Sequence, residues 1–169
     1  AGWFQRAPAD WPSHWQTVLT TANRRPPMML RINPQRGSRA DYLDRLQQAG
    51  LPAQPVAGPG MDQALVLDHP CPVSRLPGFA QGDVSVQDVS AQRAASLLLG
   101  PNDAALPRGA RVLDACAAPG GKTAHLLERR PDLKLLALDS DAQRLQRVDE
   151  NLRRLGLQAM LHSADARQT

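Results

Sequence analysis

The chain has 169 residues, 42% of them hydrophobic, which is enough to bury the core of one domain or of two small ones. No apolar run approaches the roughly 20 residues that cross a bilayer, and no signal-peptide pattern opens the chain. The sequence therefore predicts a cytoplasmic protein with no membrane partner, and its formal net charge of +4 fits a nucleic-acid partner.

The cysteines and histidines predict neither a disulfide framework nor a metal site. Cys71 and Cys116 stand in unlike contexts, which is typical of reduced thiols. The four histidines are scattered, and the cysteines lack the spacing of metal ligands. We therefore expect no bound metal.

The first half of the chain divides into two segments. Residues 1–23 predict an N-terminal helical segment, and residues 24–83 predict a small α+β domain. In that domain, residues 28–33 alternate as a strand, Ser38 opens a capping box for a helix, and residues 64–67 form a second strand.

The small domain begins with a basic stretch. Between residues 24 and 45 there are six arginines against two aspartates, a net charge of +4. Clustered arginines favour contact with a phosphate backbone, whereas a general richness in arginine can instead reflect the base composition of a genome. We expect the following residues to bind RNA: Arg24, Arg25, Arg31, Arg36 and Arg39.

Residues 84–169 predict the first half of an α/β fold with a parallel sheet. Three strands are expected to end near Asp114, Asp139 and Asp165, and the helix after the second strand begins with a capping box at Ser140. Open α/β sheets bind ligands at the carboxyl ends of their strands. A ligand site is therefore predicted at the glycine loop that follows Asp114.

The residues narrow the choice of ligand by exclusion. The last three residues of a phosphate-binding loop motif are matched by Gly121, Lys122 and Thr123. The first glycine of that motif is not matched, because Cys116 stands at its position. The dinucleotide fingerprint also fails, because the two glycines are adjacent. A P-loop-like nucleotide-binding domain stays open as an alternative at this point.

Aspartates at the two later strand ends favour a nucleoside. Asp139 can accept hydrogen bonds from both hydroxyls of a ribose, and Asp165 lies where it could bond to an adenine amino group. Many cofactors carry a free ribose, so these residues alone do not identify one.

Three segments resemble one family. Residues 114–123 resemble the S-adenosylmethionine loop of RNA cytosine-C5 methyltransferases, residues 86–92 are similar to the motif just before their catalytic fold, and residues 27–33 resemble the first strand of their small RNA-binding domain. The order and spacing are most similar to the bacterial Sun-type enzymes that methylate 16S ribosomal RNA. The resemblance extends from about Trp11 to Asp165.

The resemblance implies a Rossmann-like S-adenosylmethionine methyltransferase fold preceded by the small α+β RNA-binding domain. It implies S-adenosyl-L-methionine as the cofactor, 16S ribosomal RNA as the partner, and Lys122 at the carboxylate of the methionine moiety. The implied cofactor-binding residues are Cys116, Ala117, Ala118, Pro119, Gly120, Gly121, Lys122, Asp139 and Asp165.

The chain also departs from the family pattern. Family members carry a nucleophilic cysteine in a Thr-Cys-Ser segment and a second cysteine in an Asp-Ala-Pro-Cys segment, and neither Cys71 nor Cys116 has such a context. We therefore expect an internal fragment of a methyltransferase with no catalytic residue of its own, inactive when isolated. A non-catalytic RNA-binding module is the other alternative for the isolated chain.

A partial sheet has a physical consequence. In the doubly wound order the first strand is central, so Val112 and Leu113 are expected on an exposed edge with uncovered apolar surface. We expect the chain to self-associate through that edge or to bind the cofactor weakly, unless something covers the edge.

Overall fold

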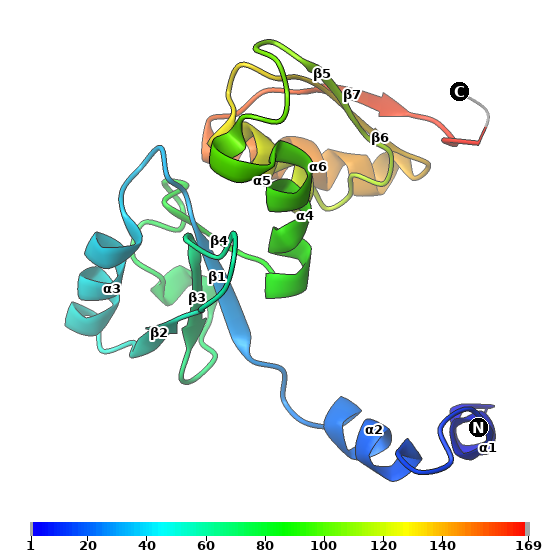
Figure 1. Ribbon diagram of the computed structural model, residues 1–169. Helices are drawn as coiled ribbons and strands as arrows, with labels where there is room; N and C mark the ends of the chain where they lie inside the picture. The colour runs from blue at the N-terminus through cyan, green and yellow to red at the C-terminus, as the bar shows by residue number, and fades with distance from the viewer. Residues whose placement is uncertain (1, 168–169) are drawn as a thin grey trace.

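The N-terminal segment forms two short helices in the computed structural model, which describes residues 2–167. Helix α1 comprises Gly2–Asp10 and helix α2 comprises Trp15–Ala22. The break between them contains Pro12, which has no backbone N–H and disfavours a helical residue before it. Both helices lie apart from the rest of the molecule and are joined to it by an extended stretch (Figure 1).

The small domain is an antiparallel sheet covered by one helix. Its strands lie in the order β2-β3-β1-β4, so the first strand is central. Helix α3 is capped by Ser38 through a capping box with Asp41, as predicted, and it buries Tyr42 and Leu46. The elements are β1 (Met28–Ile32), α3 (Arg39–Gln48), β2 (Ala53–Pro55), β3 (Ala64–Leu67), a 3-10 turn η1 (Val73–Arg75) and β4 (Val84–Val86).

The second half of the chain is a parallel sheet with helices on one side. The strands lie in the order β5-β6-β7, and all pairings are parallel, which confirms the predicted α/β class. Helices α4, α5 and α6 lie between this sheet and the small domain (Figure 1). The elements are α4 (Val89–Leu99), a 3-10 turn η2 (Pro101–Asp103), β5 (Arg111–Asp114), α5 (Gly121–Arg129), β6 (Lys134–Asp139), α6 (Ala142–Leu155) and β7 (Met160–Ser163).

The start of α6 differs from the sequence prediction by one residue. The N-cap is Asp141 rather than Ser140, because the Asp141 carboxylate accepts hydrogen bonds from the N–H groups of Gln143 and Arg144. A carboxylate caps as well as a hydroxyl does and also interacts favourably with the positive end of the helix dipole.

Among the residues that the structure describes, no helix covers the face of the parallel sheet that points away from α4, α5 and α6 (Figure 1). Leu113, Leu136 and Met160 lie opposite one another across the three strands. Leu113 is 57% exposed and Met160 is 72% exposed. An apolar row therefore crosses this open face, and it begins on the edge strand β5.

Candidate cofactor-binding site

The glycine loop joins β5 to α5 at the carboxyl end of the sheet. Gly120 is the N-cap of α5 and has a φ of +96°, a conformation that strongly favours glycine. A Cβ atom there would lie 3.1 Å from Val148 Cγ1 and 3.2 Å from Val148 Cα on α6. Gly120 thus permits both the turn and the close approach of α6 to the loop.

Asp114 holds the loop to the first turn of α5. Its Oδ2 accepts a 2.7 Å hydrogen bond from the Thr123 hydroxyl, and its Oδ1 accepts a 3.4 Å bond from the Cys116 N–H. Thr123 is fully buried. In a phosphate-binding loop this hydroxyl would bind Mg²⁺, whereas here it donates to Asp114. The arrangement weighs against the nucleotide-binding alternative.

Asp139 anchors the other side of the loop. Its side chain is 2% exposed and accepts hydrogen bonds from the N–H groups of Asp141 (3.1 Å) and Ala118 (3.0 Å). These two bonds hold the pKa of Asp139 below its usual range, with a smaller contribution from Arg144. Asp139 is therefore ionised at neutral pH and bound to the loop backbone.

The three aspartates lie on one rim of the sheet. Asp114 and Asp139 are the last residues of two adjacent parallel strands, and Asp165 follows the third strand closely. The Asp165 carboxylate accepts hydrogen bonds from Arg167, which lower its pKa. The predicted rim of carboxylates is confirmed, while the contacts of Asp139 and Asp165 with a ligand stay predictions.

The loop residues differ in what they can offer a ligand. Ala117 and Ala118 are buried in the core beneath the sheet. Cys116, Pro119 and Lys122 are exposed, and Lys122 lies in the first turn of α5. Of the loop residues predicted to bind the cofactor, these three have the accessible side chains.

The structure corrects one predicted RNA contact. Arg31 has no exposed surface. Its Nε and Nη2 atoms donate to the two carboxylate oxygens of Glu128 at 2.9 and 2.8 Å, so this guanidinium is not available to a phosphate. Arg24, Arg25 and Arg36 are exposed, whereas Arg39 is half-buried and donates to the Met61 carbonyl. Their contacts with RNA stay predictions.

A buried polar contact between the two domains was missed by the sequence interpretation. We call it the domain seam: one face of α5 meets polar side chains of β1 and of the loops beside it. Its members are Gly121, His125 and Glu128 of α5, with Arg31, Gln35, Gln63 and Gln87 on the other side. The alternation of residues 28–33 carries no signal that Arg31 points into another domain.

Burial changes the titration of two seam residues. Burial lowers the pKa of His125 to about 2, and the nearby charges of Arg31 and Arg129 act in the same direction. Burial raises the pKa of Glu128, and the ion pair with Arg31 opposes part of that change. The seam thus holds a neutral imidazole beside a buried ion pair.

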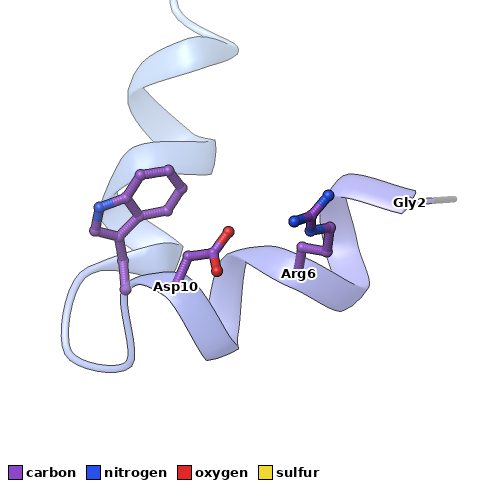
Figure 2. Close-up of a pocket in the computed structure, with 4 residues that line it drawn as sticks. Gly2, Arg6 and Asp10 are labelled. Carbon is purple, nitrogen blue, oxygen red and sulfur yellow. The ribbon is translucent and has the colours of Figure 1, made fainter.

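A separate hollow lies on the N-terminal helices. It is lined by Gly2, Arg6, Asp10 and Trp11, and Figure 2 shows Arg6 and Asp10 projecting from the same side of α1. No residue of the glycine loop lines it. Because it lacks the rim of strand ends, we do not assign the ligand to it.

Two further findings concern the described part of the chain. Among residues 2–167, no group of three or more histidine, cysteine, aspartate or glutamate side chains could hold a metal ion. Within the same residues, the helices are all too short or too polar to span a membrane.

Two family models match the chain, one on each half. Residues 2–74 match the model described as "Methyltr_RsmF/B-like, ferredoxin-like domain", and residues 96–169 match "16S rRNA methyltransferase RsmB/F". Ribosomal RNA small subunit methyltransferase B of Pseudomonas syringae pv. tomato is 50% identical over 169 residues, which cover 99% of this chain and 36% of that protein. The protein of the same name in Vibrio cholerae is 46% identical, with 98% and 37% covered.

Solved structures agree on the fold. A methyltransferase homologue from Pyrococcus horikoshii is 27% identical with a TM-score of 0.73, and the match covers 96% of this chain and 52% of that one. NSun6 from Pyrococcus horikoshii, solved with SFG, is 18% identical with a TM-score of 0.75 and coverage of 97% and 65%. This chain spans little more than a third of the length of the curated relatives named above. It belongs to the RsmB/F family of 16S rRNA methyltransferases.

Proposed function

We propose that this chain supplies the cofactor site and part of the RNA-binding surface of an enzyme that methylates carbon 5 of a cytosine in 16S ribosomal RNA. The observation that carries the proposal is the glycine loop of α5, which lies on a rim of three aspartates at parallel strand ends. Such an enzyme works where small-subunit RNA is found, in the cytoplasm.

The donor set suits S-adenosyl-L-methionine. The first N–H groups of α5 have no partner within the helix, and with Lys122 they can bind a carboxylate. Carboxylates on the rim can accept hydrogen bonds from ribose hydroxyls and from an adenine amino group. The cofactor supplies an activated methyl group, and the chain's own residues bind and orient its two ends.

Neither cysteine of this chain is proposed as the nucleophile. Methylation at carbon 5 requires a thiolate to add to carbon 6 of the cytosine. Cys71 packs against the core of the small domain, and Cys116 is an exposed member of the cofactor loop. We therefore propose that the 169-residue chain alone transfers no methyl group, and methyl incorporation into small-subunit RNA by this chain would contradict that.

We propose that the two sheets belong to regions with different roles, one in RNA contact and one in cofactor binding. Residues 24–83 contact RNA through Arg24, Arg25 and Arg36, with a contribution from Arg39, and residues 84–169 bind the cofactor. The exposure of the first three arginines supports this assignment.

Calorimetric titration tests the cofactor assignment. S-adenosylmethionine or S-adenosylhomocysteine is expected to bind the chain, and ATP with magnesium is not. Binding of ATP with magnesium in preference to both would favour the nucleotide-binding alternative. RNA binding in gel shifts, with no detectable cofactor binding, would favour a non-catalytic RNA-binding module.

A further inference from the structure

Arg31 touches the cofactor loop as well as the ion-pair partner already described. Its Nη1 donates a 2.9 Å hydrogen bond to the backbone carbonyl of Gly121 and also donates to Gln87 Oε1. Gly121 is the first residue of α5, directly after the glycine loop. One fully buried guanidinium of the small domain therefore contacts the start of the cofactor-binding helix.

The Gly121 carbonyl belongs to the same peptide group as the Lys122 N–H. A peptide group is planar and trans, so its C=O and N–H point in opposite directions. Because the carbonyl points to Arg31 in the domain seam, the N–H points away from the seam, toward the open end of α5. A hydrogen bond from a cation also polarises this peptide group and strengthens its N–H as a donor.

Other seam contacts restrict the guanidinium in turn. The two hydrogen bonds to Glu128 fix the plane of the Arg31 guanidinium. Its Nη1 atom, which donates to Gly121, also donates to Gln87. A Cβ atom on Gly121 would lie 3.2 Å from Gln87 Nε2, so the side chain of Gln87 packs closely on this residue. Arg31 has little freedom to move relative to the Gly121 carbonyl.

We propose that Arg31 is a positioning residue of the cofactor site: from the small domain, it holds the Gly121–Lys122 peptide group so that the N–H groups of α5 face the carboxylate of the cofactor. The inference rests on the proposed function, since it assigns a support to the same site. Arg31 does not touch the cofactor and acts through the backbone of Gly121.

A paired substitution tests the proposal without leaving a buried charge. The double variant Arg31→Met with Glu128→Leu removes both partners of the ion pair, and such replacements are often tolerated. The control is Arg154→Met, since Arg154 also bridges the domains. It donates from α6 to the carbonyls of Phe79 and Val84 and stacks on the Phe79 ring, and none of these contacts involves the cofactor loop.

Two measurements on the 169-residue chain are compared between these variants. The first is amide hydrogen exchange at Ala124, whose N–H donates to the Gly120 carbonyl at 2.9 Å and closes the first turn of α5. Exchange at Leu145, which closes the first turn of α6 through Asp141, is the internal reference. The second is the dissociation constant for S-adenosylhomocysteine, from calorimetry.

In the double variant we expect exchange at Ala124 to rise about tenfold relative to Leu145, and cofactor binding to weaken about fivefold, the effect of losing roughly one hydrogen bond. In Arg154→Met, both quantities are expected to stay within about twofold of the unchanged chain. Equal behaviour of the two variants would overturn the proposal and leave Arg31 as a simple link between domains.

The conservative variant Arg31→Lys separates charge from geometry. Lysine keeps the charge beside Glu128, but it lacks the planar fork that reaches Glu128 and Gly121 together. We expect exchange at Ala124 to stay raised in this variant, and a return to the unchanged value would contradict the proposal. If the unchanged chain binds no cofactor, the proposed function fails, whereas the exchange measurements still decide the role of Arg31.

Discussion

The two faces of α5 are buried by different means. One face packs Leu126 and Leu127 into the apolar core beneath the parallel sheet. The opposite face, in the domain seam, buries Glu128 and His125 against polar partners. Apolar burial stabilises in proportion to area and needs no particular partner, whereas a buried polar group is tolerated only while its own partner is present.

Because of this difference, we expect the domain seam to favour one relative position of the two domains. A buried ion pair adds little net stability, because desolvation offsets most of the attraction between the charges. Losing one member is costly, however, so an arrangement of the domains that separates Arg31 from Glu128 is strongly disfavoured. Apolar packing alone would allow more sliding between the domains.

The largest expected effect is the loss of one seam charge. Glu128→Ala leaves the Arg31 guanidinium buried without its carboxylate, and we expect the free energy of unfolding to fall by about 3–5 kcal/mol. Leu127→Ala, on the apolar face, is expected to cost about 2–5 kcal/mol. Urea denaturation of both variants measures these losses.

The polar face differs from the apolar face if a second substitution can restore the stability that the first one removes. Adding Arg31→Met to a Glu128→Leu background should recover most of the stability lost on the seam, because no charge is then left unpaired. No polar partner exists whose removal could rescue Leu127→Ala. If the double variant is as unstable as the Glu128→Ala variant, the stability of the seam does not depend on pairing the two charges. The proposed difference between the polar and apolar faces of α5 is then wrong.

Acid should weaken the seam through His125. The folded state keeps this imidazole neutral, with a pKa of about 2, while the unfolded chain protonates it below its ordinary value of 6.5. Since the unfolded state then binds the extra proton, stability falls as pH falls below about 6.5, by about 2 kcal/mol at pH 5 relative to pH 8. Urea denaturation across this pH range measures the loss.

A variant isolates the contribution of His125 from that of the carboxylates. His125→Gln cannot titrate, so the difference in stability between the two proteins should change by about 2 kcal/mol between pH 8 and pH 5. A difference that is independent of pH would mean that the imidazole is protonated or solvated in the folded state.

The sequence predicted the apolar face of α5 and not its polar face. Ala124, Leu126 and Leu127 follow helical spacing, and glycines with strand ends at Asp114 and Asp139 indicate the loop and the rim. Periodicity reports which residues are apolar, so it cannot show that a charged residue is buried against a distant partner. Arg31 and Glu128 are separated by 97 residues, and only the packing of the domains brings them together.

The uncovered apolar row on the parallel sheet predicts that the chain self-associates. Within residues 2–167, no helix lies over the apolar row of Leu113, Leu136 and Met160, and β5 is an edge strand of the sheet. We expect the 169-residue chain to self-associate, and Leu113→Lys to shift it toward the monomer by charging the edge. Sedimentation equilibrium measures this, and a monodisperse monomer with leucine at residue 113 would contradict the prediction.

The smallest expected effect contrasts arginines on the surface with the arginine in the seam. Arg24, Arg25 and Arg36 are exposed, and each phosphate contact with single-stranded RNA contributes about 0.7 to the slope of log affinity against log salt concentration. Replacing all three with glutamine should therefore reduce the slope by about 2 in anisotropy titrations with a 16S RNA fragment. The Arg31→Met, Glu128→Leu double variant should leave the slope unchanged, because a guanidinium with no exposed surface releases no counterions from RNA. An equal reduction in both proteins would mean that the seam opens when RNA binds.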